Sequence, residues 1–223
     1  MFIVDIYQNS LAKILHLHRR QIMANKKNLK VLKIIGLVVG IIAGIIVLTI
    51  SGFHTFFLVS TPESFVIEKG ANYFEYETGK DSAGYAAAYA LRTLGDDVNG
   101  KQIYEQIADK KADGSVSPKA LADTLEKMGY KINLWTGTLH RMRYEASKGV
   151  PVLTYIKSSA DSDDFHFVAV VGADSKNMYL FDPRESLKNS DNENYNREIK
   201  KEDFLNLWSA SMSDFKMYIT ISK

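Results

Sequence analysis

The stretch KDSAGYAAAYALRTLG, from Lys80 to Gly95, predicts the helix around which the rest of the chain is organised. Asp81 can cap this helix, because its carboxylate can accept hydrogen bonds from the first free backbone N–H groups. The alanines and leucines that follow favour helix, and Gly95 lies where a helix C-cap glycine belongs. Ser82 therefore lies at the first turn, where the helix dipole favours a nucleophile or an oxyanion. Taken alone, Asp81 and Ser82 have a simpler interpretation as an ordinary N-cap pair.

A second stretch, DDFHFVAVVGADSKNMYLFDP from Asp163 to Pro183, predicts a β-hairpin. Two apolar runs flank a turn at residues 173–176, which places His166 on the first strand and Asp182 at the end of the second. Residues distant in sequence come opposite each other in an antiparallel pair, so Asp182 can orient the imidazole of His166. A residue at the helix start that faces this pair would complete an arrangement of nucleophile, base and orienting acid.

These two stretches, with DGSVSPKALADTLEKMGY and KGVPVLTYI between them, resemble the C39 peptidases in their order, over the region from Tyr73 to Ile221. The C39 peptidases are papain-like cysteine peptidases, best known as leader-peptide-cleaving domains of bacteriocin exporters and as stand-alone C39-like proteins. The resemblance implies an α+β, papain-like fold in which an N-terminal helix packs on an antiparallel sheet. The element order, with helices first and antiparallel strands later, indicates the same class.

The resemblance assigns the positions of the family's catalytic triad to Ser82, His166 and Asp182. The base and the orienting acid match the family. The nucleophile does not, because the family has cysteine where this chain has Ser82.

The oxyanion-hole position also departs from the family pattern. In the family the helix often opens with Asp-Cys-Gly, and a glutamine a few residues earlier helps to form the oxyanion hole. The matching position falls near Tyr76 or Glu77, and we assign it to Tyr76. A register one residue later, which pairs the family's Cys-Gly with Ala83 and Gly84, stays open. In that register the nucleophile position holds an alanine.

The losses at these positions predict a degenerate peptidase that binds a peptide or leader segment without cleaving it. A cysteine thiol is acidified by a neighbouring imidazolium and a helix start, whereas a serine hydroxyl needs an oxyanion hole and geometry built for it. Two alternatives stay open: an active peptidase with a Ser82-His166-Asp182 triad, and a structural or interaction ectodomain. The chain has no cysteine, which excludes a thiolate nucleophile and a disulfide. Neither a cofactor nor a metal is expected from its motifs.

The net charge of +2 is unevenly distributed along the 223 residues. Residues 1–33 contain seven basic residues and one acidic residue, whereas the rest contains 21 basic and 25 acidic residues. A nucleic-acid-binding domain is usually basic, so the acidic remainder predicts no nucleic-acid partner.

Residues 34–59 predict a transmembrane signal anchor. No charged residue occurs between Lys33 and Glu63, which leaves enough apolar sequence to cross a bilayer. The basic flank precedes the apolar segment, so the positive-inside rule puts the N-terminus in the cytoplasm and the domain outside the cell membrane. A cleaved signal peptide is the rival interpretation, but the apolar region is long and no small-x-small site follows it directly.

Three glycines four residues apart, Gly36, Gly40 and Gly44, form a stripe along which two such helices could pair. Met23 opens a sequence that resembles the ordinary start of a membrane-anchored protein, so we expect it to be the true start. The expected organisation is a basic cytoplasmic segment at 1–33, the anchor at 34–59, a juxtamembrane linker at 60–72 and the C39-like domain at 73–223.

The secondary structure expected in the domain follows from the spacing of apolar residues and from the capping residues. Ser117 and Thr138 are expected to cap helices. Helices are expected at 82–94, 100–110, 117–129, 138–148 and 201–209. Strands are expected at 132–135, at 150–157, in the hairpin and at 215–221, with a polar surface loop at 184–196.

Overall fold

The computed structural model describes residues 37–42, 44, 61–208 and 216–223, and the chain divides into two units, Met1–Phe56 and Phe57–Lys223. In the first unit, the described residues 37–42 and 44 are helical. Among all residues described, no helix is long and apolar enough to span a bilayer. The other residues of the expected anchor at 34–59, and all of the expected cytoplasmic segment, lie outside the described residues.

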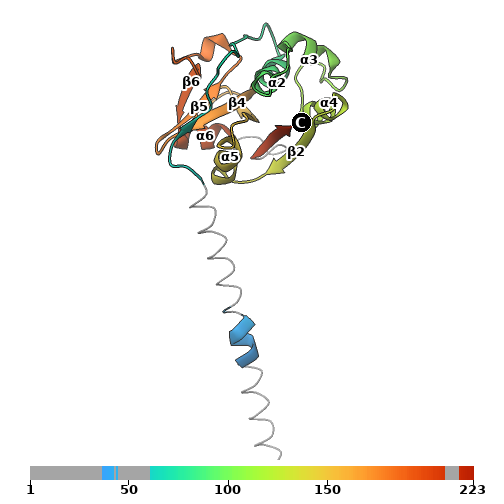
Figure 1. Ribbon diagram of the computed structural model, residues 1–223. Helices are drawn as coiled ribbons and strands as arrows, with labels where there is room; N and C mark the ends of the chain where they lie inside the picture. Colours follow the sequence, from blue (N-terminus) through green and yellow to red (C-terminus); the bar gives the residue numbers. More distant parts are fainter. Residues whose placement is uncertain (1–36, 43, 45–60, 209–215) are drawn as a thin grey trace, which may run out of the picture. The chain divides into compact units, whose positions relative to one another are not determined.

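An antiparallel sheet forms the centre of the second unit (Figure 1). Its strands lie in the order β2-β7-β3-β4-β5-β6, and β1 pairs with the end of β4. The strands are β1 Phe65–Val66, β2 Lys131–Thr136, β3 Val152–Lys157, β4 Phe165–Ala173, β5 Asn177–Phe181, β6 Arg197–Lys200 and β7 Met217–Ser222. The predicted hairpin is confirmed, because β4 and β5 pair with Ala169 opposite Phe181.

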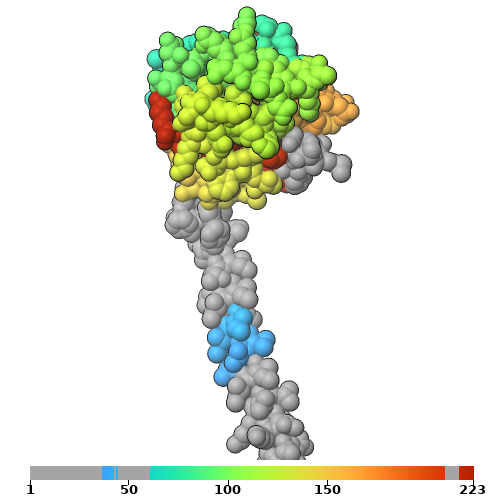
Figure 2. Space-filling model, turned by 90° about the vertical axis from the view of Figure 1, so that its right-hand side faces the viewer, coloured from blue at the N-terminus to red at the C-terminus, as the bar shows by residue number. Residues whose placement is uncertain are grey.

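Helices cover both faces of the sheet, and the sheet separates two hydrophobic cores. The helices are α2 Ser82–Thr93, α3 Gly100–Gln106, α4 Pro118–Lys127, α5 Leu139–Ala146 and α6 Lys201–Trp208. Ile103 of α3 and Leu121 of α4 share one core with α2, whereas Met142 of α5 and Phe204 of α6 belong to the other. Figure 2 shows the face that α3, α4, β2 and α5 form. The expected α+β fold with its first helix packed on an antiparallel sheet is thus confirmed.

The first helix, α2, is buried along most of its length, because its small side chains let it approach the sheet closely. All ten residues from Ser82 to Leu91 are buried. Tyr89 fixes the contact by stacking on Phe181 of β5 with ring centroids 4.4 Å apart. Gly95 follows the helix with a φ of +90°, which confirms the predicted C-terminal glycine.

The predicted side-chain cap of α2 is wrong. Asp81 occupies the N-cap position but makes no capping hydrogen bond with its side chain. Its Oδ1 instead accepts from the backbone N–H groups of Thr78 and Gly79, at 3.1 Å each. The carboxylate therefore stabilises the turn that leads into α2 rather than the first turn of the helix.

Gly84 has no space for a side chain. A Cβ at this position would lie 2.2 Å from the carbonyl oxygen of Gly100, at the start of α3. We expect Gly84→Ala to lower the free energy of unfolding by about 1–3 kcal/mol, although alanine favours helix more than glycine does. Urea denaturation measures the change. Gly79→Ala is the matched control, because a Cβ there meets nothing within 4 Å. Equal stability of the two variants would contradict the close packing of α2 on α3.

Three segments differ from the expectation. The strand β6, which was not expected, pairs with β5. The second helix ends at Gln106 rather than at residue 110, because Ile107 is extended. The polar stretch 184–196 is mostly loop, but its last residue, Asn196, is fully buried. The Asn196 side chain accepts from the backbone N–H of Asp182 and donates to its carbonyl oxygen, both at 2.7 Å, so it holds the end of β5.

Candidate functional site

His166 and Asp182 form a buried pair in the sheet. His166 lies near the start of β4, Asp182 directly follows β5, and both side chains are 0% exposed. The distances from Nε2 of His166 to Oδ2 and Oδ1 of Asp182 are 2.9 and 3.1 Å. The predicted contact between these two side chains is confirmed.

The Asp182 carboxylate is held by three donors. Besides His166, the guanidinium of Arg197 reaches Oδ2 at 2.5 Å and the backbone N–H of Arg184 reaches Oδ1 at 2.9 Å. Burial alone would raise the pKa of Asp182, but the charge and hydrogen bond of His166, and the charge of Arg197, together lower it below its ordinary value. Asp182 is therefore an ionised acceptor at neutral pH, and Nε2 of His166 carries the proton that it accepts.

This assignment leaves Nδ1 as the free nitrogen of His166. Nδ1 is buried and has no hydrogen-bond partner among the residues that the structure describes. An imidazole oriented through one nitrogen, with the other unoccupied, has the geometry of a general base.

Ser82 lies at the start of α2 as predicted, but its hydroxyl does not bond to the imidazole. The Ser82 Oγ, on a residue only 5% exposed, accepts a hydrogen bond from the backbone N–H of Phe167 at 3.0 Å. The structure thus joins Ser82 to the residue after His166, and among the described residues Nδ1 of His166 has no hydrogen bond to Ser82. The next residue, Ala83, is 1% exposed and carries no reactive group.

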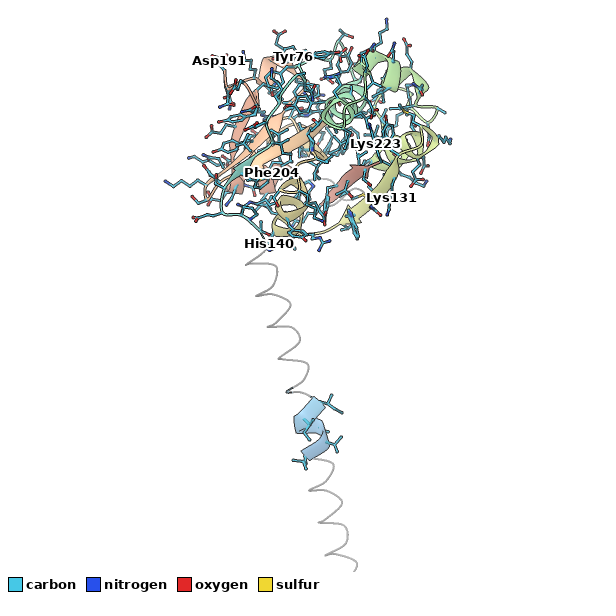
Figure 3. All side chains as sticks on the ribbon, viewed as in Figure 1. Tyr76, Lys131, His140, Asp191, Phe204 and Lys223 are labelled. Atoms are coloured by element: carbon cyan, nitrogen blue, oxygen red, sulfur yellow. The ribbon has the colours of Figure 1, made fainter. Side chains whose placement is uncertain are left out.

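The two candidates for the oxyanion-hole position lie differently. Tyr76 is half-buried and lies at the outer edge of the domain (Figure 3). The Glu77 side chain is 7% exposed, and its Oε1 accepts from Nε of Arg184 at 2.5 Å. Burial raises the pKa of Glu77, and Arg184 only partly opposes this. Its other oxygen, Oε2, is buried without a partner in the described part of the chain.

Four charged side chains next to the site pair with one another, and we call them the clasp: Glu77, Lys80, Asp164 and Arg184. Arg184 pairs with both Glu77 and Asp164, and Lys80 also pairs with Asp164. The clasp joins the segment before α2 to the loop before β4 and to the turn after β5, so it ties the helical half of the domain to the sheet.

The clasp could not be predicted from the sequence, because Asp164 and Arg184 each lie in a polar loop. One signal was present: Asp164 precedes His166 by two residues, and Arg184 follows Asp182 by two. When two strands bring His166 and Asp182 together, their flanking loops meet as well. A pocket of about 480 Å³ adjoins the clasp, and its lining includes Lys80, Lys111, Asp113, Tyr155, Asp164 and Phe165.

Comparisons with known proteins agree with this geometry. The profile described as the Peptidase_C39 like family matches residues 84–214. No curated protein matches the chain.

Three solved structures are similar. The peptidase domain of Streptococcus ComA, a bifunctional ABC transporter involved in a quorum sensing pathway, has a TM-score of 0.53 at 13% identity, over 67% of this chain and 96% of that chain. A protein from Bacillus anthracis described as a C39-like peptidase has a TM-score of 0.56 at 16% identity, over 73% of this chain and 98% of that chain. A double glycine motif protease from an AMS/PCAT transporter, solved in complex with the leader peptide, has a TM-score of 0.45 at 14% identity, over 72% of this chain and 97% of that chain.

Proposed function

Because the family profile matches more than half of it, the chain belongs to the peptidase C39-like family, and we propose that its domain binds a peptide segment without cleaving it. One observation carries the proposal: His166 is oriented as a base, yet its Nδ1 has no partner in the described residues. Ser82 is engaged by a backbone N–H instead, and the chain has no cysteine. A base without a nucleophile cannot begin covalent catalysis.

We infer that Ala83, rather than Ser82, stands at the nucleophile position. In the family a glycine follows the nucleophile, and Gly84 is the residue of this turn that cannot carry a Cβ, because Gly100 lies against it. The hydrogen bond between Ser82 and Phe167 supports the same register. A helix that opens with alanine at this position has no group to attack a peptide carbonyl.

We further infer that Glu77 takes the place of the family's oxyanion glutamine. It is buried beside the site, whereas Tyr76 lies at the edge of the domain. A glutamine side chain donates an N–H to the developing oxyanion. An ionised Glu77 offers only acceptor oxygens and would repel that charge. Neither residue 77 nor residue 83 therefore supplies the group that the family uses there, the side-chain oxyanion donor and the nucleophile.

Purified full-length protein tests the proposal with double-glycine leader peptides as probes. We expect saturable binding by isothermal titration calorimetry and no cleavage product by mass spectrometry. Ser82→Ala should bind equally well, because only one hydrogen bond to Phe167 is lost, at a cost of about 1 kcal/mol in stability. Cleavage that Ser82→Ala abolishes would instead establish a serine peptidase with a Ser82-His166-Asp182 triad. Failure to bind any of the peptides would favour an interaction ectodomain.

We also propose that residues 34–59 anchor the protein in the cell membrane, with residues 60–223 on the extracytoplasmic side. The uncharged sequence between Lys33 and Glu63, and the basic segment before it, support this orientation. Protease added to intact cells should remove the domain while a cytoplasmic marker stays intact. Digestion of the domain only after lysis would contradict the orientation.

A further inference from the structure

The clasp holds the Arg184 guanidinium between two carboxylates. Arg184 donates to Glu77 through Nε at 2.5 Å, and its Nη1 bonds to Asp164 and to the Ser158 hydroxyl. The Arg184 side chain is 12% exposed, and that of His166 is 0% exposed. The backbone N–H of Arg184 donates to Asp182, so the clasp adjoins the buried His166–Asp182 pair.

Two unpartnered atoms lie at the site, and one of them indicates the chemistry of a ligand. Oε2 of Glu77 and Nδ1 of His166 are buried without hydrogen bonds to any described residue. A carboxylate oxygen such as Oε2 of Glu77 can only accept hydrogen bonds. A buried acceptor without a donor is costly, so a group with several N–H donors would complete the site. Ammonium and guanidinium groups have such donors and no acceptors.

The charges of the clasp select the same ligand. Arg184 pairs with two carboxylates, of Glu77 and Asp164, and Lys80 pairs with Asp164. If Arg184 leaves, Glu77 stays behind as a buried carboxylate without a cation. Leaving a buried charge uncompensated is strongly unfavourable. A ligand cation removes that penalty, whereas a neutral or acidic group does not.

We propose that the slot between Glu77 and Asp164 is a subsite for a basic side chain. Arg184 occupies it in the structure, and a bound peptide places a lysine or arginine side chain there in exchange. Arg184 itself shows that a guanidinium fits between the two carboxylates. Because Arg184 lies in the polar loop after β5, it can leave without breaking a strand. This proposal rests on the proposed peptide-binding function, which it narrows to peptides with a basic residue.

The Arg184→Ala variant of the full-length protein tests the subsite directly. The probes are N-acetyl-arginine methylamide and its citrulline analogue, which has the same shape but no charge. We expect Arg184→Ala to bind the arginine probe about tenfold more tightly than the citrulline probe, and more tightly than wild type does, because the internal guanidinium no longer competes. Adding Glu77→Gln to this variant should remove the preference.

Equal affinity of Arg184→Ala for both probes, or no binding of the arginine probe by the folded variant, would overturn the proposal. Circular dichroism establishes whether the variant folds. Arg184→Gln is the second variant, because glutamine keeps an amide in the slot but removes the charge. A leader peptide that binds wild type equally well after all its lysines and arginines are replaced would overturn the subsite and leave peptide binding intact. Arginine binding without leader-peptide binding would support the subsite and count against those peptides as ligands.

Discussion

Replacing Asp182 with alanine should lower the free energy of unfolding by about 3–5 kcal/mol. The carboxylate is fully buried and accepts from His166, from the Arg197 guanidinium and from the backbone N–H of Arg184. Its removal leaves the Arg197 charge, on a side chain 9% exposed, without its buried partner. Urea denaturation at neutral pH measures the loss.

Asp191→Ala is the control for this substitution. Asp191 also pairs with a cation, Lys188, but its side chain is 94% exposed, so its removal should leave the urea midpoint unchanged. If Asp182→Ala changed stability as little as Asp191→Ala, the buried pair would not contribute to the fold.

Acid should remove the same stabilisation. The pKa of Asp182 is lower in the folded protein than in the unfolded chain, because His166 and Arg197 outweigh the effect of burial. The ionised carboxylate therefore stabilises the fold above its unfolded pKa, and the stabilisation is lost as the pH falls through the folded pKa. Asp182→Asn should lack this part of the acid dependence.

Local signals were sufficient to predict most of the fold. Ser117 and Thr138 cap their helices as expected, by accepting from the backbone N–H groups of Ala120 and Arg141. Such caps act within one helical turn, so neighbouring residues are enough to identify them. The hairpin could also be predicted from the sequence, because the apolar runs of β4 and β5 are adjacent in it. This hairpin also brought His166 and Asp182 into one site.

The partners of Ser82 and Glu77 could not be predicted in this way. The β4–β5 ladder ends where Ala169 pairs with Phe181, so the Phe167 N–H has no partner on β5, and Ser82 provides one. Where a ladder ends depends on the whole sheet. Glu77 and Arg184 are 107 residues apart and meet only after the two halves of the domain pack. Long-range ion pairs of this kind produce no periodic pattern of residues from which they could be predicted.

Together, Ala83→Cys and Glu77→Gln should convert the domain into a peptidase. The cysteine supplies a thiol at the helix start, and Nδ1 of His166, without a partner in the described residues, can accept its proton. The glutamine replaces a carboxylate with an N–H donor for the oxyanion. It also removes one of the two ion pairs of Arg184. We expect the double variant to cleave double-glycine peptides about 10²–10³ times faster than Ala83→Cys alone, because one oxyanion donor is worth that factor.

Ser82 and Ala83 are neighbours at the start of α2, so a cysteine at position 82 provides the matched control. Ser82→Cys with Glu77→Gln introduces the same thiol one residue earlier, where the native side chain faces the Phe167 N–H instead of the imidazole. We expect this variant to stay inactive and its thiol pKa to lie above that of the Ala83→Cys variant. The chain has no native cysteine, so the ultraviolet absorbance of the thiolate reports on the introduced residue alone. If the Ser82 variant were the one that cleaved, Ser82 would hold the nucleophile position. The loss of activity would then result from a single replacement, of the cysteine sulfur by the serine oxygen.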